Sequence, residues 1–138
     1  MMQLAGNGII RPGILSCNIG TASRWLCPGQ THTRHRIQDQ YLLPCRQRTV
    51  GDTGFLLTGG VALKWLRDNI LHMSDFEEMS DLAGTAPAGS DGLLFLPYLS
   101  GERCPYNDPN ARGIYFGMSL YHSREHLIRS TMEGVIFG

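Results

Sequence analysis

The stretch at 92–117 constrains the fold of this chain more than any other. A short apolar run at 93–96 ends at Pro97, and an apolar run of this length closed by proline is more often a buried strand than a helix. A polar loop rich in turn-forming residues follows, and the chain then enters a second β-type run at 114–116. The sequence therefore predicts two strands joined by a long, ordered polar loop.

Four charged side chains in this loop could suggest acid–base chemistry: Glu102, Arg103, Asp108 and Arg112. General acid–base catalysis would require the carboxylates to converge on one reacting group. We favour the simpler interpretation, a loop held together by ion pairs. Cys104 lies in the same loop, and we assign it no reactivity.

Four segments of the chain carry a wider pattern. They are NGIIRPGILSCNIGTAS at 7–23, LTGGVALKWLRDNI at 57–70, GLLFLPYLSGERCPYNDPNARGIYFG at 92–117 and SREHLIRSTMEGVIFG at 123–138. In combination they resemble the FGGY family of carbohydrate kinases, and within it the xylulokinases. The resemblance covers residues 1–23 and 54–138, which is most of the chain.

The resemblance implies an α/β fold, namely an incomplete ribonuclease H-like domain of the actin-like ATPase class. Kinases of this family have two large α/β domains with the active site between them, whereas a chain of 138 residues buries one core. We therefore expect residues 1–138 to be a partial C-terminal domain, an internal fragment of a larger enzyme. Strands are expected near 14–18 and 93–96, and helices near 60–71 and 123–138.

The resemblance places the ATP phosphates against two glycine-containing turns. Phosphoryl transfer depends on positioning and charge stabilisation, so it needs N–H groups and hydroxyls close to the phosphates. Glycine lets the backbone approach, and a following threonine adds a donor. Gly20 and Thr21 are therefore the expected ATP-phosphate-binding residues, with a plain turn as the alternative. Gly60 and Lys64 are the expected nucleotide-binding residues, with a simple helix start and a solvated lysine as the alternative.

Side chains are predicted to cap two helices. Thr58 precedes the helix expected at 60–71, and Ser74 or Asp75 precedes a short helix expected at 76–82. Hydroxyl and carboxylate oxygens at these positions can accept hydrogen bonds from the unpaired N–H groups of a first helical turn.

His122 and His126 lie four residues apart at the start of the last expected helix. A histidine pair with this spacing can bind a metal ion, but the neighbouring sequence supplies no third ligand. We therefore expect a surface pair beside Glu125 and Arg129, and we assign no metal site.

Residues 24–53 break the pattern of the rest. They show neither the two-residue nor the 3.6-residue apolar period, and they hold five arginines and two histidines against two aspartates. The family carries two or three strands at this place, whereas this stretch has few strand signals.

Three interpretations of 24–53 compete. Zinc-type ligands are present at Cys27, His32, His35 and Cys45. Their spacing fits no standard zinc pattern. The second interpretation is a basic nucleic-acid-binding arm, but the arginines of the stretch form no repeated pattern. We favour translation in the wrong frame, because codons for 34–46 can be read one nucleotide later as DTEFRTNTFCHA, which is similar to family sequence here. The aberrant stretch would then have no selected function.

The composition is that of a soluble protein. The formal net charge is zero and 42% of residues are hydrophobic, which argues against nucleic-acid or membrane-surface partners. No apolar stretch approaches the roughly 20 residues that span a bilayer. The four cysteines are scattered, which favours reduced thiols in the cytoplasm over disulfides.

The activity implied for the intact enzyme is ATP-dependent phosphorylation of D-xylulose to D-xylulose 5-phosphate, with Mg²⁺ as cofactor. A homodimer of the intact enzyme is left open. The alternatives are a kinase for another sugar or polyol, such as gluconate, and a non-catalytic interaction module. The family's general base is an aspartate expected just upstream of Met1. No catalytic residue is therefore assigned, and the chain alone is expected to be inactive.

Overall fold

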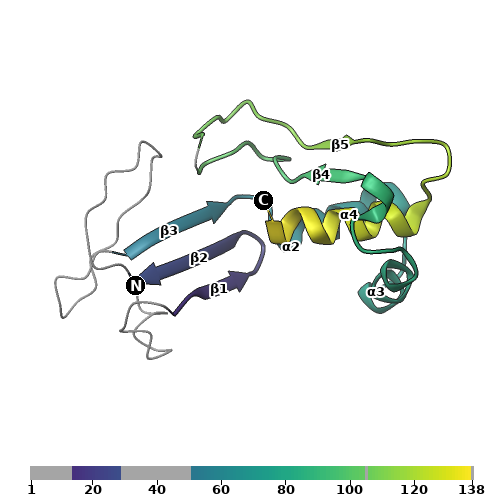
Figure 1. The fold of residues 1–138 in the computed structure, drawn as a ribbon, viewed down its shortest axis with the longest axis horizontal. Helices are drawn as coiled ribbons and strands as arrows, with labels where there is room; N and C mark the ends of the chain where they lie inside the picture. Colours follow the sequence, from purple (N-terminus) through teal and green to yellow (C-terminus); the bar gives the residue numbers. More distant parts are fainter. Residues whose placement is uncertain (1–13, 29–50, 105, 138) are drawn as a thin grey trace.

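The computed structural model describes residues 14–28, 51–104 and 106–137 (Figure 1). A three-stranded sheet lies at one end of the molecule, and the helices with a two-stranded hairpin lie at the other. In chain order the elements are β1 (Ser16–Ile19), β2 (Ser23–Pro28), β3 (Gly51–Leu56), α2 (Gly60–Trp65), η1 (Leu66–Leu71), α3 (Phe76–Thr85), η2 (Ser90–Gly92), β4 (Leu94–Leu96), β5 (Ile114–Phe116) and α4 (Arg124–Phe137).

The three-stranded sheet is antiparallel in the order β1-β2-β3. Cys17 of β1 lies opposite Trp25 of β2, and Arg24 of β2 lies opposite Phe55 of β3. Both ends of the unpatterned stretch 24–53 therefore form strands, although the stretch has few strand signals. Ladder hydrogen bonds are made by backbone groups, so pairing does not require an apolar side-chain period.

Several expectations fall on residues outside the described ranges. Residues 29–50 are among these, so the reading-frame hypothesis stays a prediction. The same holds for the zinc-type ligands His32, His35 and Cys45, and for the family-like segment at 7–13.

The β4–β5 hairpin packs on α4. Phe95 lies opposite Tyr115 in the hairpin register, and their ring centroids are 4.6 Å apart. The Tyr115 hydroxyl lies 2.6 Å from Thr131 Oγ1 of α4. Gly134 allows the helix to come this close, because a Cβ there would collide with the Phe95 carbonyl oxygen. The expected strand near 93–96 and the expected final helix are confirmed.

A second apolar cluster joins the helices. It is built from the buried side chains Leu66, Met79, Ala83 and Ile128. The helix expected at 60–71 is helical throughout, but it changes from α to π hydrogen bonding at Leu66 and ends at His72, whose φ of 51° is left-handed. Asp75 caps α3 as predicted, since its Oδ1 accepts a 2.7 Å hydrogen bond from the Glu78 N–H.

Candidate functional site

The turn between β1 and β2 meets the start of α2. The N–H groups of Gly59 and Val61 donate to the Thr21 carbonyl at 2.9 and 3.3 Å, and the Gly60 N–H donates to the Gly20 carbonyl at 2.6 Å. The structure therefore brings together three of the four predicted nucleotide-side residues. We call Gly20, Thr21, Gly59 and Gly60 the glycine junction.

The close approach at this junction requires glycine. A Cβ on Gly59 would lie 2.7 Å from the Ala22 carbonyl carbon and would collide with Ser23 Oγ. A Cβ on Gly60 would lie 2.9 Å from the Gly20 carbonyl oxygen. Gly20 and Gly60 are both exposed, so the junction presents bare backbone to an approaching ligand.

The first N–H groups of α2 are not free to bind an anion, in contrast to our expectation for this helix start. Those of Gly60 and Val61 already donate to the turn. Two side chains near the junction can donate to a ligand: the Thr21 hydroxyl, and the Lys64 ammonium one turn further along α2. Both residues are exposed, so a phosphate here would be held by movable groups rather than by helix amides.

Thr58 does not cap α2, contrary to the prediction. Gly59 occupies the N-cap position without a side-chain hydrogen bond, because the turn carbonyls already accept from the N–H groups that a cap would serve. Thr58 is 1% exposed, and its hydroxyl has no partner among the described residues. The Ser23 hydroxyl is also buried and also has no hydrogen-bond partner among the described residues. Ser23 and Gly59 were not among the predicted site residues, and the doubled glycine at the helix start was an available signal for Gly59.

The long loop at 97–113 is built around Glu102. This residue is 4% exposed, and its Oε2 accepts 2.8 Å hydrogen bonds from the N–H groups of Tyr106 and Asn107. Burial raises the pKa of Tyr98, and the Glu102 charge raises it further, so Tyr98 stays neutral near pH 7. The Glu102 carboxylate thus organises the loop backbone.

Among the described residues, three of the four charged loop side chains bind backbone groups instead of forming the predicted ion pairs. Glu102 binds backbone N–H groups, Asp108 Oδ1 accepts from the Asn110 N–H at 2.8 Å, and Arg112 donates to the carbonyls of Pro109 and Ala111. These side chains do not converge on a reacting centre. Backbone groups satisfy them because a tight turn leaves its own N–H and C=O groups without ladder partners.

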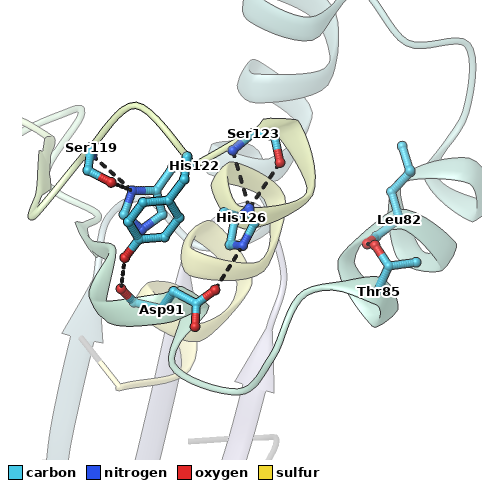
Figure 2. Close-up of polar contacts among 8 residues, drawn as sticks. Leu82, Thr85, Asp91, Ser119, His122, Ser123 and His126 are labelled. Carbon is cyan, nitrogen blue, oxygen red and sulfur yellow. Dashed lines mark hydrogen bonds and ion pairs between the residues drawn. The ribbon is translucent and has the colours of Figure 1, made fainter.

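His122 and His126 form a pair, as expected: their ring centroids lie 5.4 Å apart with the rings edge to face, and both residues are partly exposed (Figure 2). The Ser119 N–H donates to Nδ1 of His122 at 2.9 Å, and the Ser123 N–H donates to Nδ1 of His126 at 3.2 Å. Nε2 of His126 lies 3.2 Å from Asp91 Oδ2, and its side chain is 12% exposed. The described residues contain no group of three or more His, Cys, Asp or Glu that could hold a metal ion.

These contacts indicate the tautomer of the neutral His126 ring. Because Nδ1 accepts from Ser123, the ring proton of the neutral imidazole is on Nε2 and is donated to Asp91. Ser123 precedes α4, and a side chain three residues later that accepts from its N–H forms half of a capping box. His126 therefore stabilises the start of α4.

Replacing His126 with alanine is expected to lower the free energy of unfolding by about 1 to 2 kcal/mol, because the acceptor for Ser123 and the donor to Asp91 are both lost. His126→Gln keeps an acceptor at the capping position and should recover part of the loss. Urea unfolding followed by circular dichroism measures both variants. Equal loss in the two variants would remove the capping explanation.

An apolar groove of about 890 Å³ lies between α3, β4 and α4, away from the glycine junction. Its two charged side chains are paired: Arg129 Nε lies 2.7 Å from Glu133 Oε1, and Glu133 also accepts from the Gly89 N–H. The groove offers apolar surface and no reactive side chain.

Comparison with known proteins places most of the chain in one protein family. Residues 15–138 match the FGGY family of carbohydrate kinases, C-terminal domain. The chain is 34% identical over 145 residues to gluconokinase of Bacillus subtilis, covering 96% of this chain and 28% of that protein. It is 32% identical over 136 residues to a xylulose kinase of Staphylococcus epidermidis, covering 96% and 27%. The chain thus spans about a quarter of the length of the curated relatives it matches.

A solved structure agrees with the sequence matches. The ligand-bound xylulose kinase from Lactobacillus acidophilus superimposes with a TM-score of 0.76 at 33% identity, over 89% of this chain and 25% of that chain. Such neighbours have the actin-like ATPase fold, which is ribonuclease H-like, so the predicted α/β fold class is confirmed.

Proposed function

Because this chain belongs to the FGGY family of carbohydrate kinases, we propose that it forms the nucleotide-phosphate side of an ATP-dependent sugar kinase. One observation carries the proposal: backbone hydrogen bonds join the Gly20 turn to the start of α2 in a single exposed junction. The reaction of the whole protein would be transfer of a phosphoryl group to a sugar hydroxyl.

Thr21 and Lys64 are the side chains that we propose to hold the phosphates. Charge is spread over the phosphate oxygens during phosphoryl transfer, so catalysis rests on positioning and electrostatic stabilisation. Gly20 and Gly60 would let those oxygens approach, the Thr21 hydroxyl would donate to them, and Lys64 would supply a point charge. Mg²⁺ would arrive with ATP, since the described residues offer no metal-binding cluster.

D-xylulose is the sugar that we propose first, and gluconate is the second candidate. Their support is similar, because a xylulose kinase and a gluconokinase match the chain at 32% and 34% identity. We also propose a cytoplasmic protein without nucleic-acid or membrane partners, and a homodimer is left open. None of the described helices combines the length and apolar character needed to cross a membrane.

A non-catalytic interaction module remains the second class of function, and it would use residues 24–53. The encoding DNA separates the two classes. Kinase sequence on both sides of this stretch supports the first class, whereas biased synonymous change within 24–53 supports the second.

Lys64 gives a direct test of nucleotide binding, because it is the only lysine of the chain. We expect Mg-ADP to slow acylation of Lys64 by an amine-reactive ester, while labelling of the N-terminal amine is unchanged. Thr21→Ala should weaken Mg-ADP binding by about tenfold, the size expected for one hydrogen bond to a charged group.

Mass spectrometry of the labelled chain and calorimetric titration provide the two measurements. Thr85→Ala is the matched control, because that hydroxyl donates to the Leu82 carbonyl on α3 (Figure 2) and takes no part in the glycine junction. Labelling of Lys64 that is indifferent to Mg-ADP would contradict the proposed function.

A further inference from the structure

Arg103 of the loop at 97–113 contacts an aromatic ring of the three-stranded sheet. The guanidinium carbon of Arg103 lies 5.2 Å from the centroid of the Phe55 ring, and that of Arg24 lies 5.6 Å from it. Figure 1 shows the loop extending from the β4–β5 hairpin toward β3. A single ring thus attracts one cation from the loop and one from the neighbouring strand.

Phe55 lies close in sequence or in strand pairing to both segments that form the glycine junction. It is the penultimate residue of β3, and the chain leads from there through Thr58 to Gly59. Arg24, directly opposite Phe55 in the β2–β3 register, follows the turn that contains Gly20. A shift of the ring would therefore be transmitted to both strands that enter the junction.

Hydrogen bonds and close packing connect the two sides of the loop to each other. Besides the two backbone N–H groups held by its carboxylate, Glu102 donates its own N–H to the Asp108 carbonyl at 2.8 Å. Gly101 adopts a φ of 89°, and a Cβ there would lie 2.9 Å from the Pro109 carbonyl oxygen. Arg103 directly follows Glu102, the residue that binds the loop backbone. A contact that holds Arg103 therefore also holds the loop. Loops of this length without regular structure are uncommon in compact domains and are often functional.

We propose that Phe55 is a positioning residue that holds the loop, through Arg103, at a fixed distance from the glycine junction. The ring attracts the guanidinium through its negative face, which an aliphatic side chain of similar volume cannot do. The role that we assign to this contact rests on the proposed function: it would keep the loop and the glycine junction aligned when nucleotide phosphates bind. The coupling itself is a property of the free chain and can be measured without ligand.

Amide hydrogen exchange of Phe55→Leu is the first test. This variant keeps apolar volume and removes the ring, and we expect exchange at the Gly59, Gly60 and Val61 amides to rise about two- to fivefold together with exchange in the loop. Phe55→Tyr keeps the ring and should match the original chain. Faster exchange confined to the loop, with the three junction amides unchanged, would overturn the proposal.

Arg103→Gln, compared with Arg112→Gln, provides the second test and does not depend on the ring variant folding. Both changes remove one guanidinium from the same loop, but Arg112 donates to the carbonyls of Pro109 and Ala111 within the loop itself. Arg103→Gln alone should raise exchange at Gly59, Gly60 and Val61. Equal junction exchange in the two variants would contradict the coupling.

Binding of Mg-ADP separates this inference from the proposed function. Absence of Mg-ADP binding by the original chain would remove the proposed function, while the exchange results would still decide the coupling. If the original chain binds Mg-ADP, Phe55→Leu should weaken binding about two- to fivefold and Phe55→Tyr should not. Equal affinity in all three proteins would show that the ring does not position the site.

Discussion

Replacing Gly134 with alanine is expected to lower the free energy of unfolding by about 1 to 3 kcal/mol, and replacement with valine by more. The added Cβ would collide with the Phe95 carbonyl oxygen, which is backbone and cannot rotate away. Helix α4 would have to move off the hairpin. Both apolar clusters include a residue of this helix, Val135 in one and Ile128 in the other, so the displacement would loosen the whole helical part.

Gly84 of α3 provides the matched control. A Cβ there would meet nothing within 4 Å, so Gly84→Ala gains helix propensity without a clash and should stabilise the chain by up to about 1 kcal/mol. Urea unfolding followed by circular dichroism compares the two substitutions in one background. We expect Gly134→Ala to lower the free energy of unfolding and Gly84→Ala to raise it. A stabilising Gly134→Ala would mean that α4 does not approach β4 as closely as the structure shows.

Replacing residues 29–50 with the residues of the alternative reading frame is expected to give the largest gain in soluble yield and β-structure. The present sequence places four arginines between Pro28 and Gly51, and buried arginines are costly without partners. The flanking strands should be left unchanged, because β2 and β3 already pair in the present frame. Soluble yield, thermal unfolding and far-UV circular dichroism are the measurements.

A shuffled replacement of residues 29–50 with the same composition is the control for this experiment. It separates the alternative sequence from the simple loss of arginine. If the present chain is monomeric, unfolds cooperatively and gains nothing from the alternative sequence, the reading-frame hypothesis is wrong. Residues 24–53 would then be native sequence throughout.

Local signals in the sequence were sufficient for several elements. The apolar run before Pro97 predicted the strand that became β4, and Asp75 predicted the cap of α3. In each case the deciding interaction lies within a few residues of the signal. Similarity to a known family then supplied the fold class, which no local signal specifies.

The predictions that failed depended on distant partners. The strand β2 has no apolar period of its own, and its pairing comes from strands on both sides. The cap predicted for Thr58 is absent because carbonyls of a turn nearly forty residues earlier in the chain accept from the same N–H groups. The contact of Arg103 with Phe55 joins two segments that no sequence spacing connects. Gly20, Thr21 and Gly60 lie together in the structure, while their role in binding nucleotide stays a prediction.

The pairing of β2 with β3 has a consequence for how insertions and substitutions are tolerated between them. The register runs from Ser23 opposite Leu56 to Pro28 opposite Gly51, so the connecting segment enters and leaves the sheet at two adjacent points. The entropy of closing such a connection grows only with the logarithm of its length, by about 0.6 kcal/mol for each doubling. The two strands can therefore keep their alignment while the sequence between them drifts in length and content.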